Sequence, residues 1–193
     1  MARPKQFDPD LAAQEAMEAF WENGYNATSV SDLLIEMGLN KGSLYGTFGD
    51  KKKLFLAALN KYQDQNVAII REVLDRPRSA QEAIEALLQL AVERCTGEEA
   101  ARGCLAAKAA MELAAHDPDI SAWIKRFHER KVELVAQTIR RGQQQGEIDR
   151  DLDARAVARF LLNGVAGLYL SGMTGPSEEE VQDVVRLMLK VLK

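Results

Sequence analysis

Nucleophilic and metal-binding side chains are few in this sequence. Two cysteines, Cys95 and Cys104, and two histidines, His116 and His128, all lie in its middle third. Thiolate and imidazole groups together are ligands for copper or zinc, and an exposed thiol of low pKa can be oxidised or alkylated. Cys95 continues an apolar helical stripe and Cys104 begins a segment of small residues, which favours a packing role for both. A thiol or metal sensor is the alternative.

Motifs of enzyme active sites are missing from the sequence. It contains no GxSxG, no phosphate-binding glycine loop, no dinucleotide fingerprint and no HExxH. Glu112 and His116 are four residues apart, whereas the di-iron bundle motif places them three apart. We therefore predict that the protein is not an enzyme and that it holds no cofactor and no metal.

The residues from 28 to 54 have a pattern typical of nucleic-acid recognition. Apolar residues recur on one helical face on either side of Gly38, namely Val30, Leu33 and Leu34 before it and Leu39, Leu44 and Phe48 after it. Ser29 or Thr28 can cap the first helix, Asn40 can cap the second, and Gly38 can adopt the positive φ of a tight turn. This pattern predicts a helix-turn-helix.

The outward face of the second helix is short, polar and positive, and consists of Lys41, Gly42, Ser43, Tyr45 and Thr47. Side chains near the N-terminus of a recognition helix reach base edges in the major groove. The residues assigned to base reading are Asn40, Lys41, Ser43 and Thr47, with Thr28 and Ser29 supporting them from the preceding helix. Gly42 has no side chain, which lets the helix approach the DNA backbone closely.

The net charge alone does not favour a nucleic-acid ligand. The chain is formally −4, and residues 1–55 hold more acids than bases. Acids concentrate between residues 8 and 22, whereas the bases lie in a short N-terminal arm, residues 1–5, and at Lys41 and 51–53. Distribution matters more than the sum, so a dipolar domain of this kind can present a positive face to phosphate.

Helical periodicity continues through the rest of the chain. With 193 residues, of which 47% are apolar, the protein can bury a sizeable core. Apolar stripes follow N-cap signals at Asp8, Ser29, Asn40, Asp50, Ser79, Asp117, Asp153 and Ser177. We predict an all-α fold with two domains. Residues 1–60 form an N-terminal three-helix helix-turn-helix domain, and residues 61–193 form a C-terminal helical bundle domain. A fourth helix connects the first domain to the second.

The spacing of one set of residues resembles the N-terminal domain of the TetR (tetracycline repressor) family of bacterial transcription regulators. The set is Thr28, Asp32, Leu33, Gly38, Leu39, Gly42, Ser43, Leu44, Tyr45, Phe48, Lys51 and Leu54. The close match covers residues 4–59, and beyond it the likeness is one of length and helical pattern. Departures from the family pattern are Leu34 and Met37 in place of alanine, Asn40 in place of serine or threonine, and Thr47 in place of histidine or tyrosine.

The resemblance implies a homodimeric regulator that binds the two half-sites of a palindrome in double-stranded DNA. It also implies that Lys51 and Tyr45 contact phosphate. In the family the last two helices join their symmetry mates in a four-helix interface, which agrees with the glycine-bearing apolar faces of residues 153–193. The interface residues predicted on this basis are Val157, Phe160, Leu161, Gly164, Val165, Leu168, Val181, Val184, Val185 and Met188. The alternative is that these helices only complete the core of one protomer.

A small-molecule pocket in the second domain is the predicted means of control. The residues assigned to this effector pocket are Tyr62, Gln65, Cys104, Met111, Trp123, Phe127, His128 and Tyr169. We accordingly predict a repressor that an unidentified effector releases from its operator. The alternatives are a thiol- or metal-responsive regulator that uses Cys95 and Cys104, and a helical interaction module that does not bind DNA.

Neither a targeting segment nor a membrane span is expected. The first ten residues, MARPKQFDPD, have no apolar core region. The run from Phe160 to Met173 is interrupted by Asn163 and falls short of the roughly 20 residues that a spanning helix needs. Two cysteines are compatible with a reducing compartment. We expect a cytoplasmic protein without membrane contact.

Overall fold

The computed structural model describes residues 7–76, 79–98 and 100–192, and the basic arm predicted at residues 1–5 lies outside this part of the chain. The described residues form helices and contain no strand, which confirms the predicted all-α class. The α-helices are α1 (Pro9–Asn23), α2 (Val30–Glu36), α3 (Lys41–Phe48), α4 (Lys51–Asp75), α5 (Ala80–Thr96), α6 (Leu105–Leu113), α7 (Pro118–Gln145), α8 (Ala154–Gly172) and α9 (Glu178–Leu189), with 3₁₀ turns at Ala100–Arg102 and Lys190–Leu192.

The helix starts follow local capping chemistry. Each predicted cap residue accepts a hydrogen bond from a backbone N–H of its own first turn, and Ser29, Ser79 and Ser177 form complete capping boxes. The start of α6 differs, because the Cys104 side chain makes no capping hydrogen bond. The polar residues from Gly142 onward predict a frayed end for α7, but the helix continues to Gln145 and ends at Gly146, whose φ is +77°.

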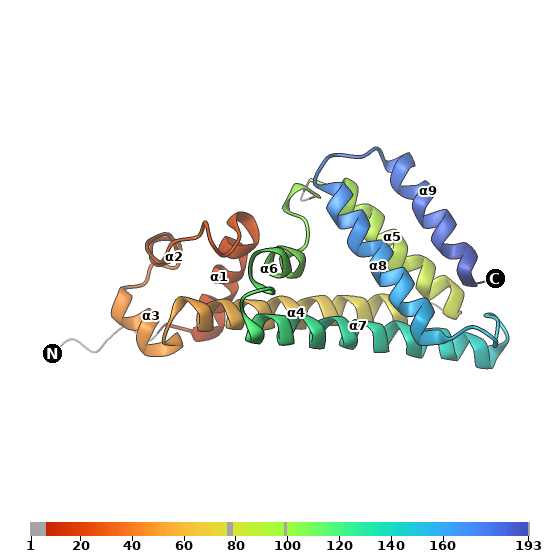
Figure 1. Ribbon diagram of the computed structural model, residues 1–193, viewed down its shortest axis with the longest axis horizontal. Helices are drawn as coiled ribbons and strands as arrows, with labels where there is room; N and C mark the ends of the chain where they lie inside the picture. The colour runs from red at the N-terminus through yellow and green to blue at the C-terminus, as the bar shows by residue number, and fades with distance from the viewer. Residues whose placement is uncertain (1–6, 77–78, 99, 193) are drawn as a thin grey trace.

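The two longest helices, α4 and α7, connect the two ends of the molecule. Helices α4 and α7 run side by side, and α4 extends from the helix-turn-helix end into the C-terminal bundle (Figure 1). Its apolar stripe buries residues from Leu54 to Leu74 without interruption by proline or glycine. A continuous helix of this kind is stiff, and it connects the helix-turn-helix directly to the bundle.

The hydrophobic core consists of two clusters. The first cluster contains residues of the four helices α1, α2, α3 and α4, among them Phe20, Leu33, Leu44 and Phe55. It also includes residues of α6 and of the first half of α7. The second joins the far halves of α4 and α7 to α5, α8 and α9. The helix-turn-helix therefore shares its core with α6 and the first half of α7.

Most residues predicted to form the dimer interface on α8 and α9 do not lie on the outer surface of these helices. Helix α9 packs mainly on α5, and six of the predicted interface residues are buried within the protomer itself: Val157, Leu161, Leu168, Val181, Val185 and Met188. Gly164 faces the Met188 side chain of the same chain, and Val165 packs partly on the same core. The six buried assignments are corrected, because packing between helices of one protomer covers these side chains. Gly164 and Val165 are half-buried, so their place in an interface stays a prediction.

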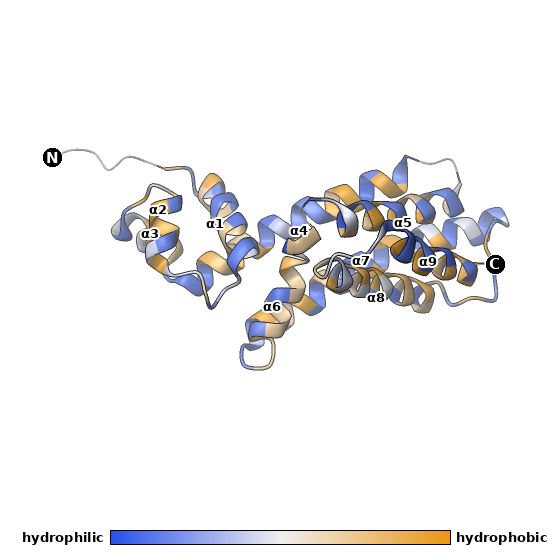
Figure 2. Cartoon of the chain, turned by 90° about the horizontal axis from the view of Figure 1, so that it is seen from above, coloured by the Kyte–Doolittle hydropathy of each residue, from blue (hydrophilic) through white to orange (hydrophobic). Residues whose placement is uncertain are grey.

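Apolar side chains nevertheless remain exposed on these two helices, and Figure 2 shows that hydrophobic and hydrophilic residues alternate along them. They are Phe160 and Val184, both predicted, together with Leu170 and Leu187, which were not predicted. In the part of the chain that the structure describes, no helix is both long and apolar enough to span a membrane.

Candidate DNA-binding surface and effector cavity

Helix α3 presents the surface predicted to read DNA. Its start is held by Asn40, whose side-chain Oδ1 accepts the Ser43 backbone N–H at 2.8 Å, and Leu44 anchors it in the core. Lys41 and Thr47 are exposed, and the Lys41 ammonium lies 5.7 Å from the centre of the Tyr45 ring. The polar side chains therefore flank the exposed side of a short, firmly capped helix.

Two glycines form the outermost ridge of α3. Gly42 and Gly46 are one helical turn apart, two residues on either side of the buried Leu44, and both are exposed. A Cβ built on Gly46 would meet nothing within 4 Å, and one on Gly42 would meet only the Asn40 Oδ1 atom at 3.3 Å. Packing within the protein does not require either glycine, so the bare backbone is available to an external partner. Gly46 was not assigned from the sequence, although its i+4 spacing from Gly42 is visible there.

Replacing Gly46 by alanine tests this ridge by separating stability from binding. We expect the free protein to be more stable by about 0.5–1 kcal/mol, because alanine reduces the entropy of the unfolded chain and favours the helix. Affinity for operator DNA should fall about tenfold, because the new methyl group holds the backbone away from the duplex. Thermal unfolding and fluorescence anisotropy measure the two effects, and unchanged affinity in the stabilised variant would contradict close backbone contact.

The two residues predicted to support base reading from the preceding helix have different positions. Ser29 is exposed and caps α2. Thr28 is only 2% exposed, and its hydroxyl donates a 2.6 Å hydrogen bond to the Gly24 carbonyl oxygen. The assignment of Thr28 to the DNA surface is corrected, because its hydroxyl stabilises the loop between α1 and α2.

The lysines at the start of α4 have protein partners. The Lys51 ammonium donates to the Tyr25 carbonyl oxygen at 2.6 Å and lies 4.2 Å from the centre of the Tyr25 ring; burial lowers the pKa of Lys51. Lys52 forms ion pairs with Asp117 and Asp119 at the start of α7, and these carboxylates raise its pKa. The negative charge of these two aspartates thus offsets the unfavourable position of Lys52 at the N-terminus of α4. The phosphate contact of Lys51 stays a prediction, since its ammonium has further donors.

Helix α6 holds the end of α1 and the following loop. The Lys108 ammonium donates to the carbonyl oxygens of Trp21 and Glu22 at 2.7 and 3.2 Å. The Glu112 carboxylate accepts the backbone N–H groups of Tyr25 and Asn26 at 3.2 and 2.8 Å. Both are charge-assisted hydrogen bonds to backbone groups at a helix end. The position of α6 therefore determines the position of the loop that leads into the helix-turn-helix.

Replacing Glu112 by alanine should loosen this connection. Two backbone N–H groups lose their carboxylate acceptor, and we expect the free energy of unfolding to fall by about 1 kcal/mol. Hydrogen exchange at the Tyr25 and Asn26 amides should accelerate. Amide exchange followed by NMR measures this, and Glu93→Ala, at an exposed glutamate on α5, is the control. Unchanged exchange at both amides would exclude a holding role for Glu112.

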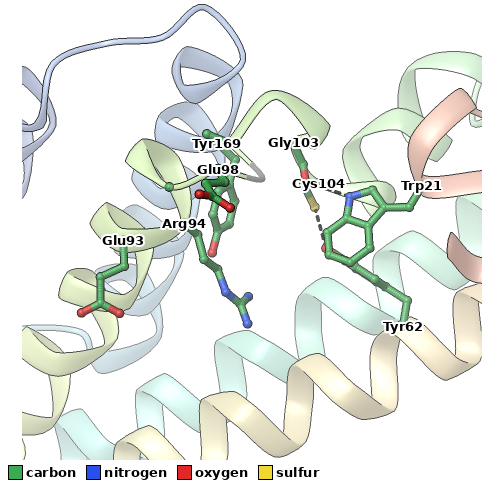
Figure 3. Close-up of a pocket in the computed structure, with 10 residues that line it drawn as sticks. Trp21, Tyr62, Glu93, Arg94, Glu98, Gly103, Cys104 and Tyr169 are labelled. Atoms are coloured by element: carbon green, nitrogen blue, oxygen red, sulfur yellow. Dashed lines mark hydrogen bonds between the residues drawn. The ribbon is translucent and has the colours of Figure 1, made fainter.

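A cavity of about 370 Å³ lies between α1, the segment before α6 and the C-terminal bundle. Its walls include Trp21 of α1, Tyr62 of α4, Arg94 of α5 and Tyr169 of α8 (Figure 3). The indole N–H of Trp21 donates to the Gly103 carbonyl oxygen at 2.9 Å. The cavity has a size typical of small-molecule sites. Because Trp21 belongs to the helix-turn-helix domain, an occupant would touch that domain directly.

A smaller cavity of about 60 Å³ adjoins the first one. Tyr62, Arg94, Cys104 and Tyr169 line both, and the smaller one is also lined by Lys131. Its other lining residues are Asn66, Ile70, Leu87, Leu90, Phe127, Leu162, Val165 and Ala166. The structure thus brings four of the predicted pocket residues together: Tyr62, Cys104, Phe127 and Tyr169. Arg94 and Lys131 were not predicted, because their position on the inner faces depends on how α5 and α7 pack.

The other four predicted pocket residues line neither cavity. Met111 is 68% exposed on α6, and Gln65 is exposed and bonded to Gln14. Trp123 is buried in the first core cluster, where its indole N–H donates to Asn60 Oδ1 at 2.8 Å. His128 is half-buried, and burial together with nearby Lys131 lowers its pKa. These assignments are corrected, because each side chain leaves its helix on a side away from the cavities.

The cysteines have distinct environments. Cys95 is buried, and burial raises the pKa of its thiol to about 11, which keeps it protonated at neutral pH. Cys104 lines the cavities with its Sγ 3.4 Å from the Tyr62 hydroxyl oxygen. Among the described residues, no three His, Cys, Asp or Glu side chains are grouped as metal ligands would be. The geometry favours a packing role for Cys95.

A capped recognition helix with an exposed polar face, carried on a larger helical domain, defines the class of helix-turn-helix regulators. Comparison with known proteins agrees with this class. Residues 14–58 match the family described as bacterial regulatory proteins, tetR family, and residues 80–188 match the tetracyclin repressor-like C-terminal domain. The chain belongs to the TetR family of bacterial transcriptional regulators.

Similar proteins extend over the full length of the chain. The regulator "Uncharacterized HTH-type transcriptional regulator YezE" of Bacillus subtilis (strain 168) is 34% identical over 193 residues and 100% of both chains. The HTH-type transcriptional repressor ComR of Escherichia coli (strain K12) is 30% identical, over 98% of this chain and 90% of its own. A solved cysteine mutant of the TetR family regulator CifR, complexed with 26bp double-strand operator DNA, is 32% identical, with a TM-score of 0.87 over 100% of both chains.

Proposed function

We propose that this protein is a homodimeric repressor that binds a palindromic operator and leaves it when a small molecule occupies the cavity beside Trp21. The observation that carries the proposal is that one wall of this cavity belongs to the helix-turn-helix domain. A bound molecule and the DNA-reading surface are thereby joined through a single helix, α1. As a bacterial DNA-binding regulator, it would act in the cytoplasm.

Recognition of DNA is assigned to α3 and its surroundings. Lys41, Ser43 and Thr47 would face base edges, and Asn40 would hold the helix start while offering its amide. Ser29 would support the base-reading residues from α2, and Tyr45 and Lys51 would contact phosphate. Gly42 and Gly46 would let the helix backbone lie close to the DNA. The likeness to the operator-bound CifR structure supports this assignment.

Dimerisation is assigned to the exposed apolar surface of α8 and α9, defined by Phe160, Leu170, Val184 and Leu187. Large exposed apolar patches mark protein interfaces, and these four residues are 41–63% exposed in the isolated protomer. Two protomers joined there would present two copies of α3 to half-sites about one helical turn, roughly 34 Å, apart.

Release from DNA would follow from differential binding. Arg102, directly before Gly103, forms ion pairs with Glu18 and Glu22 of α1 and lies over the Trp21 ring. A molecule that displaces the segment 100–104 would therefore shift α1, and α6 follows because it begins at Leu105. An effector that binds more tightly to the conformation with low DNA affinity shifts the protein toward that conformation. The affinity for DNA then falls by the corresponding coupling free energy.

Selection of bound sequences from random DNA tests the proposal. Purified protein should enrich one palindrome, and anisotropy with that duplex should show two protomers bound per site. Failure to enrich any sequence, with no gel retardation at low salt, would instead favour a helical interaction module. The enriched sequence can then be searched for in the source genome to find regulated genes.

A further inference from the structure

We propose that the effector is an amphipathic monoanion, an apolar or aromatic carboxylic acid whose carboxylate binds between Arg94 and Lys131. This inference deepens the proposed function and rests on its assignment of the cavity as the effector site. The larger cavity, described above at about 370 Å³, is called the outer chamber, and the smaller one at about 60 Å³ the inner chamber.

The inner chamber contains two cations without an opposing carboxylate. Arg94 and Lys131 line it, and its other lining residues include no aspartate or glutamate. Within the described residues, neither side chain is within ion-pairing distance of an acid. Arg94 donates to Asn66 Oδ1 at 3.4 Å, and the Lys131 ammonium lies 4.5 Å from the centre of the Phe127 ring. Both contacts leave donors free for an anion.

Burial makes these unpaired charges costly. Lys131 is half-buried in a chamber lined mainly by apolar residues of α4, α5, α7 and α8, and desolvation lowers its pKa. A buried cation without an anion is unfavourable, whereas an anion brought by a ligand supplies Coulomb attraction and hydrogen bonds at once. The hydroxyl of Tyr62, at the boundary of the two chambers, can donate an additional hydrogen bond.

The shape of the two chambers limits the ligand to one small charged group and a larger apolar body. The inner chamber, at about 60 Å³, is much smaller than the outer chamber at about 370 Å³, so it suits a single small group such as a carboxylate rather than a drug-sized molecule. The outer chamber offers the aromatic side chains of Trp21, Tyr62 and Tyr169 to the remainder of the ligand (Figure 3). In this view Arg94 extends from the side of Tyr169 toward the space between Tyr169 and the pair formed by Trp21 and Tyr62.

The outer chamber also discriminates by charge. Its lining includes Glu93 and Glu98, both exposed. Their carboxylates repel a ligand that carries further negative charge outside the inner chamber, and they do not reach the inner lining. A molecule with a single terminal carboxylate matches the charge of both chambers. A polyanion would be repelled in the outer chamber, and an amine would be repelled in the inner one.

Calorimetric titration of the full-length protein, without DNA, tests this assignment. The probes are a series of phenylalkanoates and straight-chain carboxylates, each paired with its primary amide and its primary amine. We expect a carboxylate to bind at least about tenfold more tightly than its amide, which matches the loss of a charge-assisted hydrogen bond, and the amine not to bind. Lys131→Met and Arg94→Met should each remove this preference while leaving affinity for the amide unchanged.

Two controls keep the outcome interpretable. Lys125→Met removes a charge from an exposed position on the same helix, outside both chambers, and should bind the carboxylate normally. Lys131→Met should unfold thermally at the same or a higher temperature than the parent, because a partly desolvated ammonium without an opposing carboxylate is removed. Equal affinity for acid and amide, unchanged affinity in both variants, or no carboxylate bound at about 1 mM would overturn the proposal.

The titration also separates this inference from the proposed function. Binding of the carboxylate is measured in the absence of DNA, so it does not depend on operator recognition. A carboxylate that binds through Lys131 but leaves the operator complex intact would contradict effector release and leave the ligand class supported.

Discussion

Changing Lys41 to glutamate is expected to lower operator affinity by at least about 100-fold. Lys41 is exposed in the first turn of α3, and a dimer would present it twice to the negatively charged duplex. A hydrogen bond to a charged group contributes about 1.5–3 kcal/mol, so two symmetric losses amount to about 3–6 kcal/mol. The negative charge in its place adds repulsion. Anisotropy titration of the selected duplex measures the change.

The salt dependence of the same variant distinguishes the two possible roles of Lys41. If Lys41 neutralises a phosphate, the slope of log affinity against log salt should become shallower by about 0.9 for each phosphate that is no longer neutralised. If it reads a base, the loss of affinity should be largest for the selected sequence and small for random DNA. Lys125→Glu changes the net charge equally on exposed α7 and serves as control. Affinity equal to that of the parent would remove Lys41 from the DNA surface.

Introducing glutamate at Phe160 and Leu187 together should convert the dimer to monomers. These side chains are 51% and 63% exposed on α8 and α9 and contribute little to the core of one protomer. Burying two carboxylates in each half of an apolar interface is far more costly than leaving them in water. Sedimentation velocity should show a monomer near 21.4 kDa. Operator affinity should fall by about 10²–10⁴, because the two half-sites are no longer bound by one particle.

A matched substitution shows whether position matters. Met111 is 68% exposed on α6, outside the proposed interface, so Met111→Glu should remain dimeric and bind DNA as the parent does. Circular dichroism should show unchanged helicity in all variants. A double variant that stays dimeric would place the interface elsewhere than on the exposed surface of α8 and α9.

The helices and the helix-turn-helix could be predicted because their signals are local. The cap residues Ser29, Asn40 and Ser79 each bond to an N–H only a few residues ahead, so the helix start can be read from adjacent positions. The turn at Gly38, whose φ is +59°, likewise depends on one residue type. The exposed polar face of α3 follows directly from its single buried anchor, Leu44.

The proposed effector site could be predicted only in part, since its residues come from five helices, α1, α4, α5, α7 and α8, and from the segment before α6. Tyr62 and Tyr169 were found as aromatic residues on apolar stripes, but the same criterion also selected Trp123, which is buried in the core. Arg94 and Lys131 look like ordinary surface charges in the sequence. Their inward position results from the packing of α5 and α7 against α4 and α8.

The amino-acid sequence by itself determined the helical class, the helix starts and the polar reading helix, because hydrogen bonds within a turn and apolar periodicity act over a few residues. Only the tertiary structure decided which apolar residues of α8 and α9 face inward, why Thr28 is buried, and where two unpaired cations meet aromatic walls. Those features arise from contacts between residues far apart in the chain. Because the interior is close-packed, the way in which several helices fit together determines which side chains are covered.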